Sequence, residues 1–494
     1  MFDVIIIGSG LGGLQCAYLL SKIGMKVAVI EQNAVYGGCL QSFYRRGIQF
    51  ESGFHYVGAL NNNEALNILF DYYNLLHLDW VRLDKNEFDK VFIGNQSYKF
   101  CNGFNEFSEY LKSLFPSEAS GIKAVMDVYR YVADTTFSTY KNPGFSISDE
   151  LFQTSAYSFL KKNIHDDRLI NLLSSNSLKL QLDESLPLYA FAHINGSFIE
   201  SAWRLKGGGK VLIDSLINDI KKFGCTIFNN SSVSKLIESD GNITGVILED
   251  GRCFSSKYVV SDIHPSNLIQ LIDSKIVRPI YRKRIQNLKN SFGIFTINIK
   301  LKSNSLKYQN KNLFLHSDDV DMWHFDNSHN SVKQVMVSYP VPDDYREGND
   351  VYATTIDLLT PVDYSEWEQW SSSKLGARPQ SYYDYKTNKA EEVINFTCKY
   401  IPELRDAIDV YYTSSPLTYS YYTGTVNGSA YGIMKDCNNV MSTFLTPKTP
   451  VKNLFMTGQN LNLHGILGVS MTSSLTCAEI VGMDKIVSEI KLNK

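Results

Sequence analysis

Six residues near the start of the chain have the types and spacing of a phosphate-binding turn. The run Gly8-Ser9-Gly10-Leu11-Gly12-Gly13 fits the pattern G-x-G-x-x-G. In this pattern the first glycine makes a tight turn, the second lets the backbone approach a pyrophosphate, and the third lets a helix pack close to a strand. The helix that follows would point its free N–H groups and the positive end of its dipole at the phosphates. The run therefore predicts that a dinucleotide binds here.

The residues around this turn predict the elements that must position it. Phe2–Ile7 is a short apolar run rich in β-branched residues, which is typical of a buried strand. Residues 11–23 have helical spacing, and residues 26–30 form a second strand. Glu31 and Gln32 follow about twenty residues after the turn, where a carboxylate can accept hydrogen bonds from ribose hydroxyls. This order predicts a Rossmann-like unit; the alternative is a glycine-rich turn in an ordinary α/β unit.

The composition limits the class of protein. A chain of 494 residues is too long for one compact core, so two or three domains are expected. Hydrophobic residues make up 44% and charged residues 20%, which is ordinary for a globular protein. The net charge of −3 gives no sign of a nucleic-acid partner. The 30 Tyr, 27 Phe and 5 Trp suit a large apolar ligand cavity or an aromatic core.

Cysteines and apolar runs bear on the compartment. None of the eight cysteines forms C-x-x-C, and their spacing suggests neither a disulfide framework nor a zinc site, which favours a reducing compartment. Asp3 interrupts the apolar start, so a cleaved signal peptide is not expected. No apolar run has the eighteen or so residues of a spanning helix. We expect a cytoplasmic protein, with peripheral membrane contact left open.

More glycines follow the first unit, and here a resemblance becomes visible. Gly37-Gly38 comes soon after Glu31, and residues 47–58 read GIQFESGFHYVG, which by themselves also fit a surface β-hairpin. Together with the first turn, these segments resemble flavoproteins of the phytoene desaturase, carotenoid isomerase and retinol saturase group. They look most like retinol saturases, whose motif runs G-G-C-x-x-x-F … F-D-x-G-x-H-Y-x-G. Glu51 replaces the Asp of that motif and keeps a carboxylate. Cys39 stands where phytoene desaturases and amine oxidases tend to carry Arg.

The end of the chain repeats the order of features found at its start: a strand, a glycine-rich turn and a helix. A predicted strand ends before Gly458, a glycine-rich turn covers residues 463–468, and a helix of small residues runs to about residue 482. The N-terminus of that helix can stabilise negative charge, which the resemblance places on a reduced flavin ring. Asn460 stands where retinol saturases commonly carry Asp. The resemblance also implies that the backbone near Val233 contacts adenine. The cofactor-binding residues predicted from both ends are Gly8, Gly10, Leu11, Gly12, Gly13, Glu31, Gln32, Gly37, Gly38, Val233, Gly458, Gln459, Gly465, Ile466 and Gly468.

The resemblance implies an α/β fold with two domains. The first is a discontinuous Rossmann-like FAD/NAD(P)-binding domain of the glutathione-reductase type, βαβ with a β-meander, made of residues 1–70, 201–265 and 431–494. The second is a mixed α+β substrate-binding domain of residues 71–200 and 266–430. Residues 61–200 have helical character. Their helices either cover a core or form a lid over a lipid-binding tunnel. The tyrosine-rich residues 416–432 are open between a pocket wall and a β-rich surface.

The cofactor implied by the resemblance is FAD, because Gly37-Gly38 and the C-terminal turn would both meet a flavin ring. No second G-x-G-x-x-G follows a strand, so the donor, NAD(P)H or another reductant, and any redox partner stay open. Flavin chemistry on a carbon–carbon bond needs hydride transfer at N5 and a proton handled on the other carbon. No metal-ligand spacing occurs. The candidates for the proton are His55, Tyr56, His464 and Tyr431, with His193 and Tyr421 as further possibilities.

Three functions follow from these residues and the resemblance. The leading one is an FAD-dependent oxidoreductase that saturates a C=C bond of a retinoid- or polyene-like apolar substrate. A carotenoid or polyene desaturase or isomerase on the same scaffold is the second. The third is not an enzyme but a prenyl- or lipid-binding module of the GDP-dissociation-inhibitor type, which binds no flavin. The retained Gly37-Gly38 pair speaks against the third.

Overall fold

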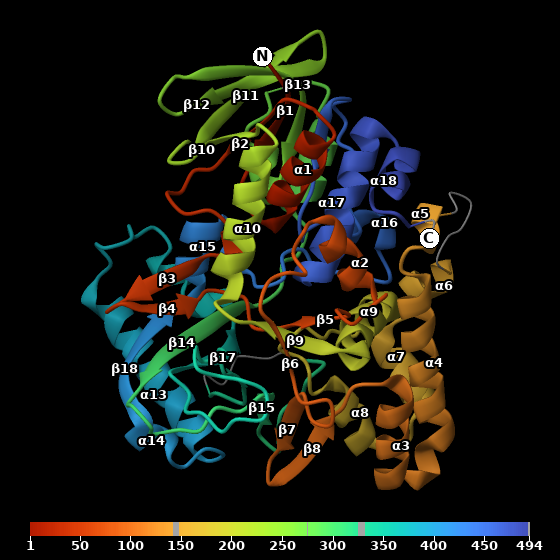
Figure 1. Cartoon of the computed structure of the whole chain (residues 1–494), viewed down its shortest axis with the longest axis vertical. Coiled ribbons are helices and arrows are strands. Elements are labelled where there is room, and N and C mark those ends of the chain that lie inside the picture. Colours follow the sequence, from red (N-terminus) through yellow and green to blue (C-terminus); the bar gives the residue numbers. More distant parts are fainter. Residues whose placement is uncertain (142–147, 274, 325–330, 493–494) are drawn as a thin grey trace.

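Two seven-stranded sheets form the framework of the molecule (Figure 1). The computed structural model describes residues 1–141, 148–273, 275–324 and 331–492. The first sheet lies at the top of Figure 1 beside the N-terminus, and the second lies below it. Helices cover both sheets, so the predicted α/β fold class is confirmed.

The first sheet has a parallel core. Strands β10, β2, β1, β13 and β19 run parallel, and β11, β12 and β13 form an antiparallel meander. The central strands carry near-continuous apolar runs, because helices pack on one of their faces and residues of β11 and β12 pack on the other. Its strands come from three separate stretches of the chain: β1 (Phe2–Ile7), β2 (Val27–Ile30), β10 (Thr226–Phe228), β11 (Val233–Ser239), β12 (Asn242–Leu248), β13 (Cys253–Ser261) and β19 (Leu454–Met456).

Two apolar clusters hold this sheet between helices. One cluster packs α1, α10, α17 and α18 against one face, and the other covers the opposite face beside α11 and α12. Figure 1 shows α1, α10 and α17 side by side below the meander. The bounds are α1 (Leu11–Lys22), α2 (Ala65–Tyr72), α10 (Gly208–Lys222), α11 (Pro265–Leu268), α12 (Pro279–Gln286), α17 (Gly465–Val481) and α18 (Met483–Glu489).

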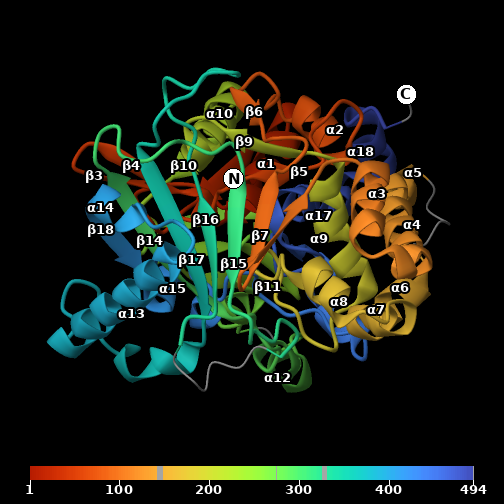
Figure 2. The ribbon, with the colours of Figure 1, turned by 90° about the horizontal axis from the view of Figure 1, so that it is seen from below.

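The second sheet has two faces with different partners. Figure 2 shows its strands side by side, with a helical bundle on the side of β7. Alternate residues of its strands belong to two different clusters, one shared with α13 and one shared with the bundle. In spatial order the strands are β18 (Ile408–Ser414), β14 (Gly293–Leu301), β17 (Thr355–Val362), β16 (Gln334–Ser338), β15 (Asn312–His316), β7 (Asp89–Ile93) and β8 (Gln96–Phe100).

Shorter elements connect these parts. The helical bundle consists of α3 (Phe104–Leu114), α4 (Ala119–Thr135), α5 (Ser138–Lys141), α6 (Asp149–Gln153), α7 (Ala156–Asn163), α8 (Asp167–Ser174) and α9 (Leu188–Glu200). The other helices and turns are η1 (Gly38–Leu40), η2 (Pro116–Glu118), η3 (Tyr364–Glu366), η4 (Glu368–Trp370), α13 (Gln380–Cys398), α14 (Leu404–Ala407), α15 (Pro416–Thr423), η5 (Val426–Gly428) and α16 (Val440–Thr443). A hairpin and a three-stranded sheet complete the set: β3 (Ser42–Arg45), β4 (Ile48–Glu51), β5 (Val57–Gly58), β6 (Trp80–Arg82) and β9 (Ala202–Leu205).

Three sequence expectations differ from the structure. Residues 61–200 are not only helical, because strands β6, β7 and β8 lie within them and β7 pairs with β15 far along the chain. Within this stretch of expected helical character, residues 151–160 do not form one continuous helix, because α6 ends at Gln153 and the side chain of Ser155 caps α7. The tyrosine-rich residues 416–432 are not β-rich; they begin with helix α15, which has Pro416 in its first turn.

Two helical glycines of the bundle give a test of its packing. A Cβ added to Gly121 of α4 would overlap the backbone carbonyl oxygen of Asn163, whereas one added to Gly196 of α9 would lie 3.5 Å from Tyr129. We expect Gly121→Ala to lower the free energy of unfolding by about 1–3 kcal/mol through overpacking. Gly196→Ala, the matched control, should raise it by up to about 1 kcal/mol. Urea unfolding measures both, and equal effects would contradict the packing of α4 against α7.

Candidate active site

A cavity of about 540 Å³ connects the two sheets. One end lies at the carboxyl ends of β1, β2, β13 and β19, where ligands bind in open α/β sheets. The other end is floored by Ile294, Met336 and Leu359, which come from three neighbouring strands of the second sheet. The cavity therefore joins a nucleotide-type edge to an apolar surface.

Glycines of the turn after β1 line the cavity, and a larger residue would not fit at these positions. A Cβ on Gly10 would overlap Oδ2 of Asp262, and a Cβ on Gly12 would lie 2.6 Å from Oδ1 of the same carboxylate. Gly8 has a φ of +98°, which residues with a side chain rarely adopt. Gly13 lies behind the lining, where a Cβ would overlap the carbonyl oxygen of Gly8. It lets α1 pack directly against β1.

The second glycine pair lies against the first turn. Gly37 forms an isolated parallel bridge with Gly10 and donates from its N–H to the carbonyl oxygen of Ser9 at 3.0 Å. Gly38 has a φ of +55°, and a Cβ there would lie 3.2 Å from Cα of Gly10. Glu31, which is buried, closes the same corner by accepting hydrogen bonds from the N–H and hydroxyl of Ser9 at 2.9 and 2.7 Å. The turn after β1 and the Gly37-Gly38 pair thus contact each other through their backbones at one wall of the cavity.

Two helices point uncapped N-termini into this cavity. Neither Gly10, the N-cap of α1, nor His464, the N-cap of α17, accepts a side-chain capping bond. Gly465, Ile466 and Gly468 of α17 line the cavity. The first N–H groups of a helix have no partner within the helix, and its N-terminus carries the positive end of the helix dipole. This donor set suits a ligand that bears negative charge at two separate places.

Asp262 occupies the first of these N-termini. It follows β13, is in the cavity lining, and accepts hydrogen bonds from the backbone N–H groups of Gly13 and Gly10. Burial raises the pKa of Asp262 to about 7; the negative charge of Glu31 adds to the rise, and the backbone hydrogen bonds oppose it. A carboxylate therefore lies at the position that a pyrophosphate would approach.

The candidate acid–base residues meet at the other end. His55, Tyr56, His193, Tyr431 and His464 all line the cavity. Burial lowers the pKa of each of the three histidines to about 4, so their rings are neutral at neutral pH. The Tyr431 ring lies against the His464 ring, with centroids 4.4 Å apart. Burial raises the pKa of both tyrosines, which stay protonated.

The tyrosine hydroxyls and one histidine already have partners. Tyr56 donates to Oδ2 of Asp89 at 2.9 Å, and Tyr431 donates to the carbonyl oxygen of Leu178. Nε2 of His464 lies 2.9 Å from the carbonyl oxygen of Lys179. Lys179 itself forms a buried ion pair with Asp89 at 2.7 Å. Burial lowers the pKa of the Lys179 ammonium, and Asp89 opposes this shift.

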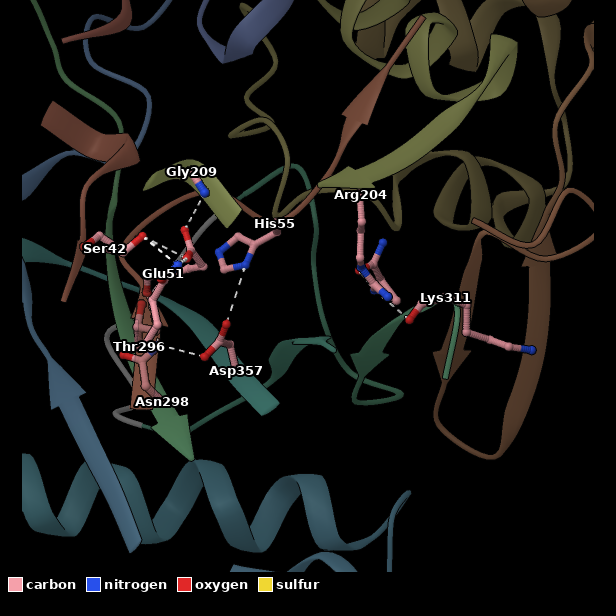
Figure 3. A network of polar contacts seen from close by, with 12 residues as sticks. Ser42, Glu51, His55, Arg204, Gly209, Thr296, Asn298, Lys311 and Asp357 are labelled. Carbon is pink, nitrogen blue, oxygen red and sulfur yellow. Dashed lines mark hydrogen bonds and ion pairs between the residues drawn. The ribbon is translucent and has the colours of Figure 1, made fainter. Parts of the chain in front are cut away.

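His55 differs, because neither of its ring nitrogens has a hydrogen-bond partner. Its Nδ1 lies 4.0 Å from Oδ2 of Asp357, which is also buried and without a partner (Figure 3). Glu51 supports the backbone nearby: its carboxylate accepts hydrogen bonds from the Gly209 N–H and the Ser42 hydroxyl, both at 2.9 Å. Burial raises the pKa of Glu51. Figure 3 shows Asp357 joined to His55, and Ser42 and Gly209 joined to Glu51.

The structure brings together nearly all the residues singled out from the sequence. The exceptions are Gly13, which lies behind the lining, and Tyr421, which is 54% exposed and outside the cavity. The other predicted residues line the cavity: Gly8, Gly10, Leu11, Gly12, Glu31, Gln32, Gly37, Gly38, His55, Tyr56, Val233, Tyr431, Gly458, Gln459, His464, Gly465, Ile466 and Gly468.

Sequence reasoning assigned no role to three buried charged residues. Asp262 follows a strand of the parallel core, a position that marks ligand contacts. Asp357 is a lone carboxylate in an otherwise uncharged strand, which was a readable signal. Lys179 lies in a turn after α8, and nothing in its sequence neighbourhood distinguishes it.

The described residues contain neither a cluster of metal-ligating side chains nor a helix able to span a membrane. No group of three or more His, Cys, Asp or Glu side chains among them could hold a metal ion. In the same part of the chain, none of the helices combines the length and the apolar character needed to cross a bilayer.

The chain is similar in sequence to several known proteins. The model of the family described as "NAD(P)-binding Rossmann-like domain" matches residues 6–73. An all-trans-retinol 13,14-reductase from Danio rerio is 25% identical and aligns with 97% of this chain and 86% of its own. Prolycopene isomerase 1 from an Oncidium hybrid cultivar is 21% identical, over 98% of this chain and 84% of its own.

The predicted resemblance is confirmed. Similarity to retinol reductases and to a carotenoid isomerase covers nearly the whole chain. A solved putrescine oxidase variant is similar in fold, with a TM-score of 0.65 at 17% identity over 97% of this chain and 98% of its own. The chain thus has the fold of these oxidoreductases, with a Rossmann-like domain at its start.

Gly10 gives a direct test of the nucleotide edge. We expect Gly10→Val to abolish FAD binding, because the side chain would fill the space beside Asp262 and the N-terminus of α1. Titration with FAD, followed by flavin fluorescence, measures the loss, and circular dichroism checks the fold. Gly196→Ala serves as the control, since Gly196 does not have a positive φ and the added carbon would lie no closer than 3.5 Å to Tyr129. Unchanged FAD affinity in Gly10→Val would place the cofactor elsewhere.

Asp262 predicts a pH dependence of that binding. Its carboxyl is neutral below its pKa of about 7 and negative above it. Since FAD carries a fixed negative charge on its pyrophosphate, we expect its affinity to fall by up to about tenfold per pH unit above neutrality. In Asp262→Asn the affinity should change little with pH. Calorimetric titrations on both sides of neutrality measure this, with Asp250→Asn at the surface as control. A wild-type affinity that is equal at both pH values contradicts the prediction.

Proposed function

We propose that this chain is an FAD-dependent oxidoreductase that saturates a C=C bond in a retinoid- or polyene-like apolar substrate. The observation that carries the proposal is the single cavity that joins two uncapped helix N-termini to an apolar sheet surface. The similarity to all-trans-retinol 13,14-reductases over nearly the full length supports the same function.

The chain's own residues fit FAD. Gly10, Gly12 and Gly38 line the cavity as backbone that a pyrophosphate could approach, and Glu31 lies where ribose hydroxyls would be. The N-terminus of α17 would stabilise negative charge on the flavin ring. When bound, FAD supplies hydride chemistry. The protein then has to align the substrate, exclude water and handle a proton.

The substrate would lie on the second sheet. Ile294, Met336 and Leu359 form an apolar floor, and Ile194 and Phe198 of α9 face the same space. We propose that an elongated apolar chain binds there and that α9, with the helices packed on it, acts as the lid. Burial of such a chain would supply most of its affinity, because this part of the lining is apolar. We propose peripheral membrane contact as the route of this substrate, which vesicle sedimentation can test.

The direction of the reaction is tested with the bound flavin as its own indicator. We expect all-trans-retinol or a related polyene to reoxidise the chemically reduced flavin under anaerobic conditions, with a product that carries two more hydrogens. Reduction of the oxidised flavin by a polyene would instead favour a desaturase. A change of double-bond geometry without net flavin oxidation would favour an isomerase. A protein that stays colourless with added FAD would favour the lipid-binding module.

The electron donor is proposed to be a separate molecule, NAD(P)H or a redox protein. The described residues hold one glycine cradle of the nucleotide type, and it is assigned to FAD. Anaerobic addition of NADH or NADPH to the oxidised protein distinguishes the two: bleaching of the flavin identifies a nicotinamide donor, and its absence indicates a redox protein.

A further inference from the structure

The proposed reduction needs a proton, and the residues singled out from the sequence do not hold a mobile one. His55, His193 and His464 are neutral at neutral pH because burial lowers their pKa values to about 4. The hydroxyl protons of Tyr56 and Tyr431 are already donated to Asp89 and to a carbonyl oxygen. A proton donor has to be sought among the groups that face these residues.

Asp357 is such a group. It lies in β17 with its side chain on the same face as Leu359, which floors the cavity, while Ile356 and Leu358 pack on the opposite face with α13. Its partners in register are Asn298 on β14 and Ser338 on β16, so a row of buried polar residues crosses the sheet. Along β17, Asp357 of this polar row is therefore followed on the same face by Leu359 of the apolar cavity floor.

Only one oxygen of Asp357 is satisfied. Oδ1 accepts a hydrogen bond from Nδ2 of Asn298 at 2.7 Å, and the same amide donates to the carbonyl oxygen of Glu51 at 3.1 Å. Oδ2 has no partner and faces Nδ1 of His55 at 4.0 Å (Figure 3). An unpaired polar atom in a protein interior is costly, so a buried pair of them, one of which belongs to the cavity-lining His55, indicates a partner that arrives with the ligand.

We propose that Asp357 holds the proton for the reaction and that it acts through His55, which passes a proton to the substrate. This rests on the proposed function and deepens it. His55 is the catalytic residue, because its ring lines the cavity, and Asp357 is the positioning residue behind it. The separation of 4.0 Å is long for a hydrogen bond, but such catalytic contacts tighten when the substrate binds.

In the proposed proton transfer, the His55 ring is neutral both before and after the step. The O–H bond of Asp357 breaks as its proton moves to Nδ1 of His55. The N–H bond at Nε2 of the same ring breaks as that proton moves to one carbon of the substrate C=C bond. The reduced cofactor, held at the glycine turns, would supply the hydride equivalent for the other carbon. Asp357 is left as a carboxylate, His55 as the opposite tautomer, and solvent protons restore both after product release.

The surroundings of the pair suit this role. Burial raises the pKa of Asp357 to about 7, the charge of Glu51 adds to the rise, and the Asn298 hydrogen bond and the positive charge of Arg204 oppose it. Arg204 also disfavours an imidazolium at His55. The other titratable group near Asp357 is Tyr419, whose hydroxyl donates to the carbonyl oxygen of Ser52. Protonated Asp357 is therefore available at and below neutrality and is lost as the pH rises.

The experiment follows reoxidation of the reduced flavin by all-trans-retinol, anaerobically and in single turnover, on both sides of neutrality. In the wild type we expect the rate to fall about tenfold per pH unit above about 7. Asp357→Asn should be about 10²–10⁴-fold slower below neutrality, lose this pH dependence and keep its retinol affinity. His55→Ala should keep its flavin, be similarly slow, and show no further loss when combined with Asp357→Asn. Asp357→Glu should recover part of the rate.

Ser338→Ala is the matched control, because Ser338 lies in the same buried row and does not face His55. It should keep the wild-type rate and pH profile. A second readout needs no substrate: the infrared difference between the wild type and Asp357→Asn should contain the carbonyl band of a protonated carboxyl that disappears as the pH passes about 7. Absence of that band, or a wild-type pH profile in Asp357→Asn, overturns the relay. If no polyene reoxidises the wild-type flavin, the proposed function fails instead, and the infrared band still decides whether Asp357 holds a proton.

Discussion

The parallel core of the first sheet brings two helix N-termini to one edge, and the rest of the site depends on this. Parallel strands end at the same edge, so the turn after β1 and the turn after β19 meet although some 450 residues of chain separate them. Both turns are built from glycine because backbone lies against backbone there. Neither N-cap side chain covers its helix, so the start of α17 faces the cavity, while at α1 the N–H groups of Gly10 and Gly13 donate to Asp262.

Glu51 connects this edge to the second sheet. Its carboxylate holds Gly209, at the start of α10, and its backbone carbonyl accepts a hydrogen bond from Asn298 of β14. One residue of the hairpin therefore fixes the distance between the nucleotide edge and the sheet that floors the cavity. Retention of a carboxylate, with Glu in place of Asp, is sufficient for the first contact, and the backbone makes the second.

Local patterns predicted the nucleotide edge well and the substrate side poorly. The strand, the glycines and Glu31 are contiguous, so their chemistry could be read from spacing alone. Strand β7 could not be predicted in the same way, because its partner β15 lies more than two hundred residues later. His55 was found from a motif, but Asp357 was not, since only the register of β17 against β14 reveals which face it occupies. Burial also turned the histidines from expected acids into neutral rings.

The polar row across the second sheet also bears on folding. A shift of β17 by one residue would move Asp357 into the apolar cluster with α13 and turn Leu358 toward the cavity. Burial of an unpaired carboxyl among those side chains would be strongly unfavourable. Within β17, whose other side chains are uncharged, this acid distinguishes the native register from its neighbours. The residue that leaves a buried polar atom unsatisfied beside His55 thereby also specifies how the strands are aligned.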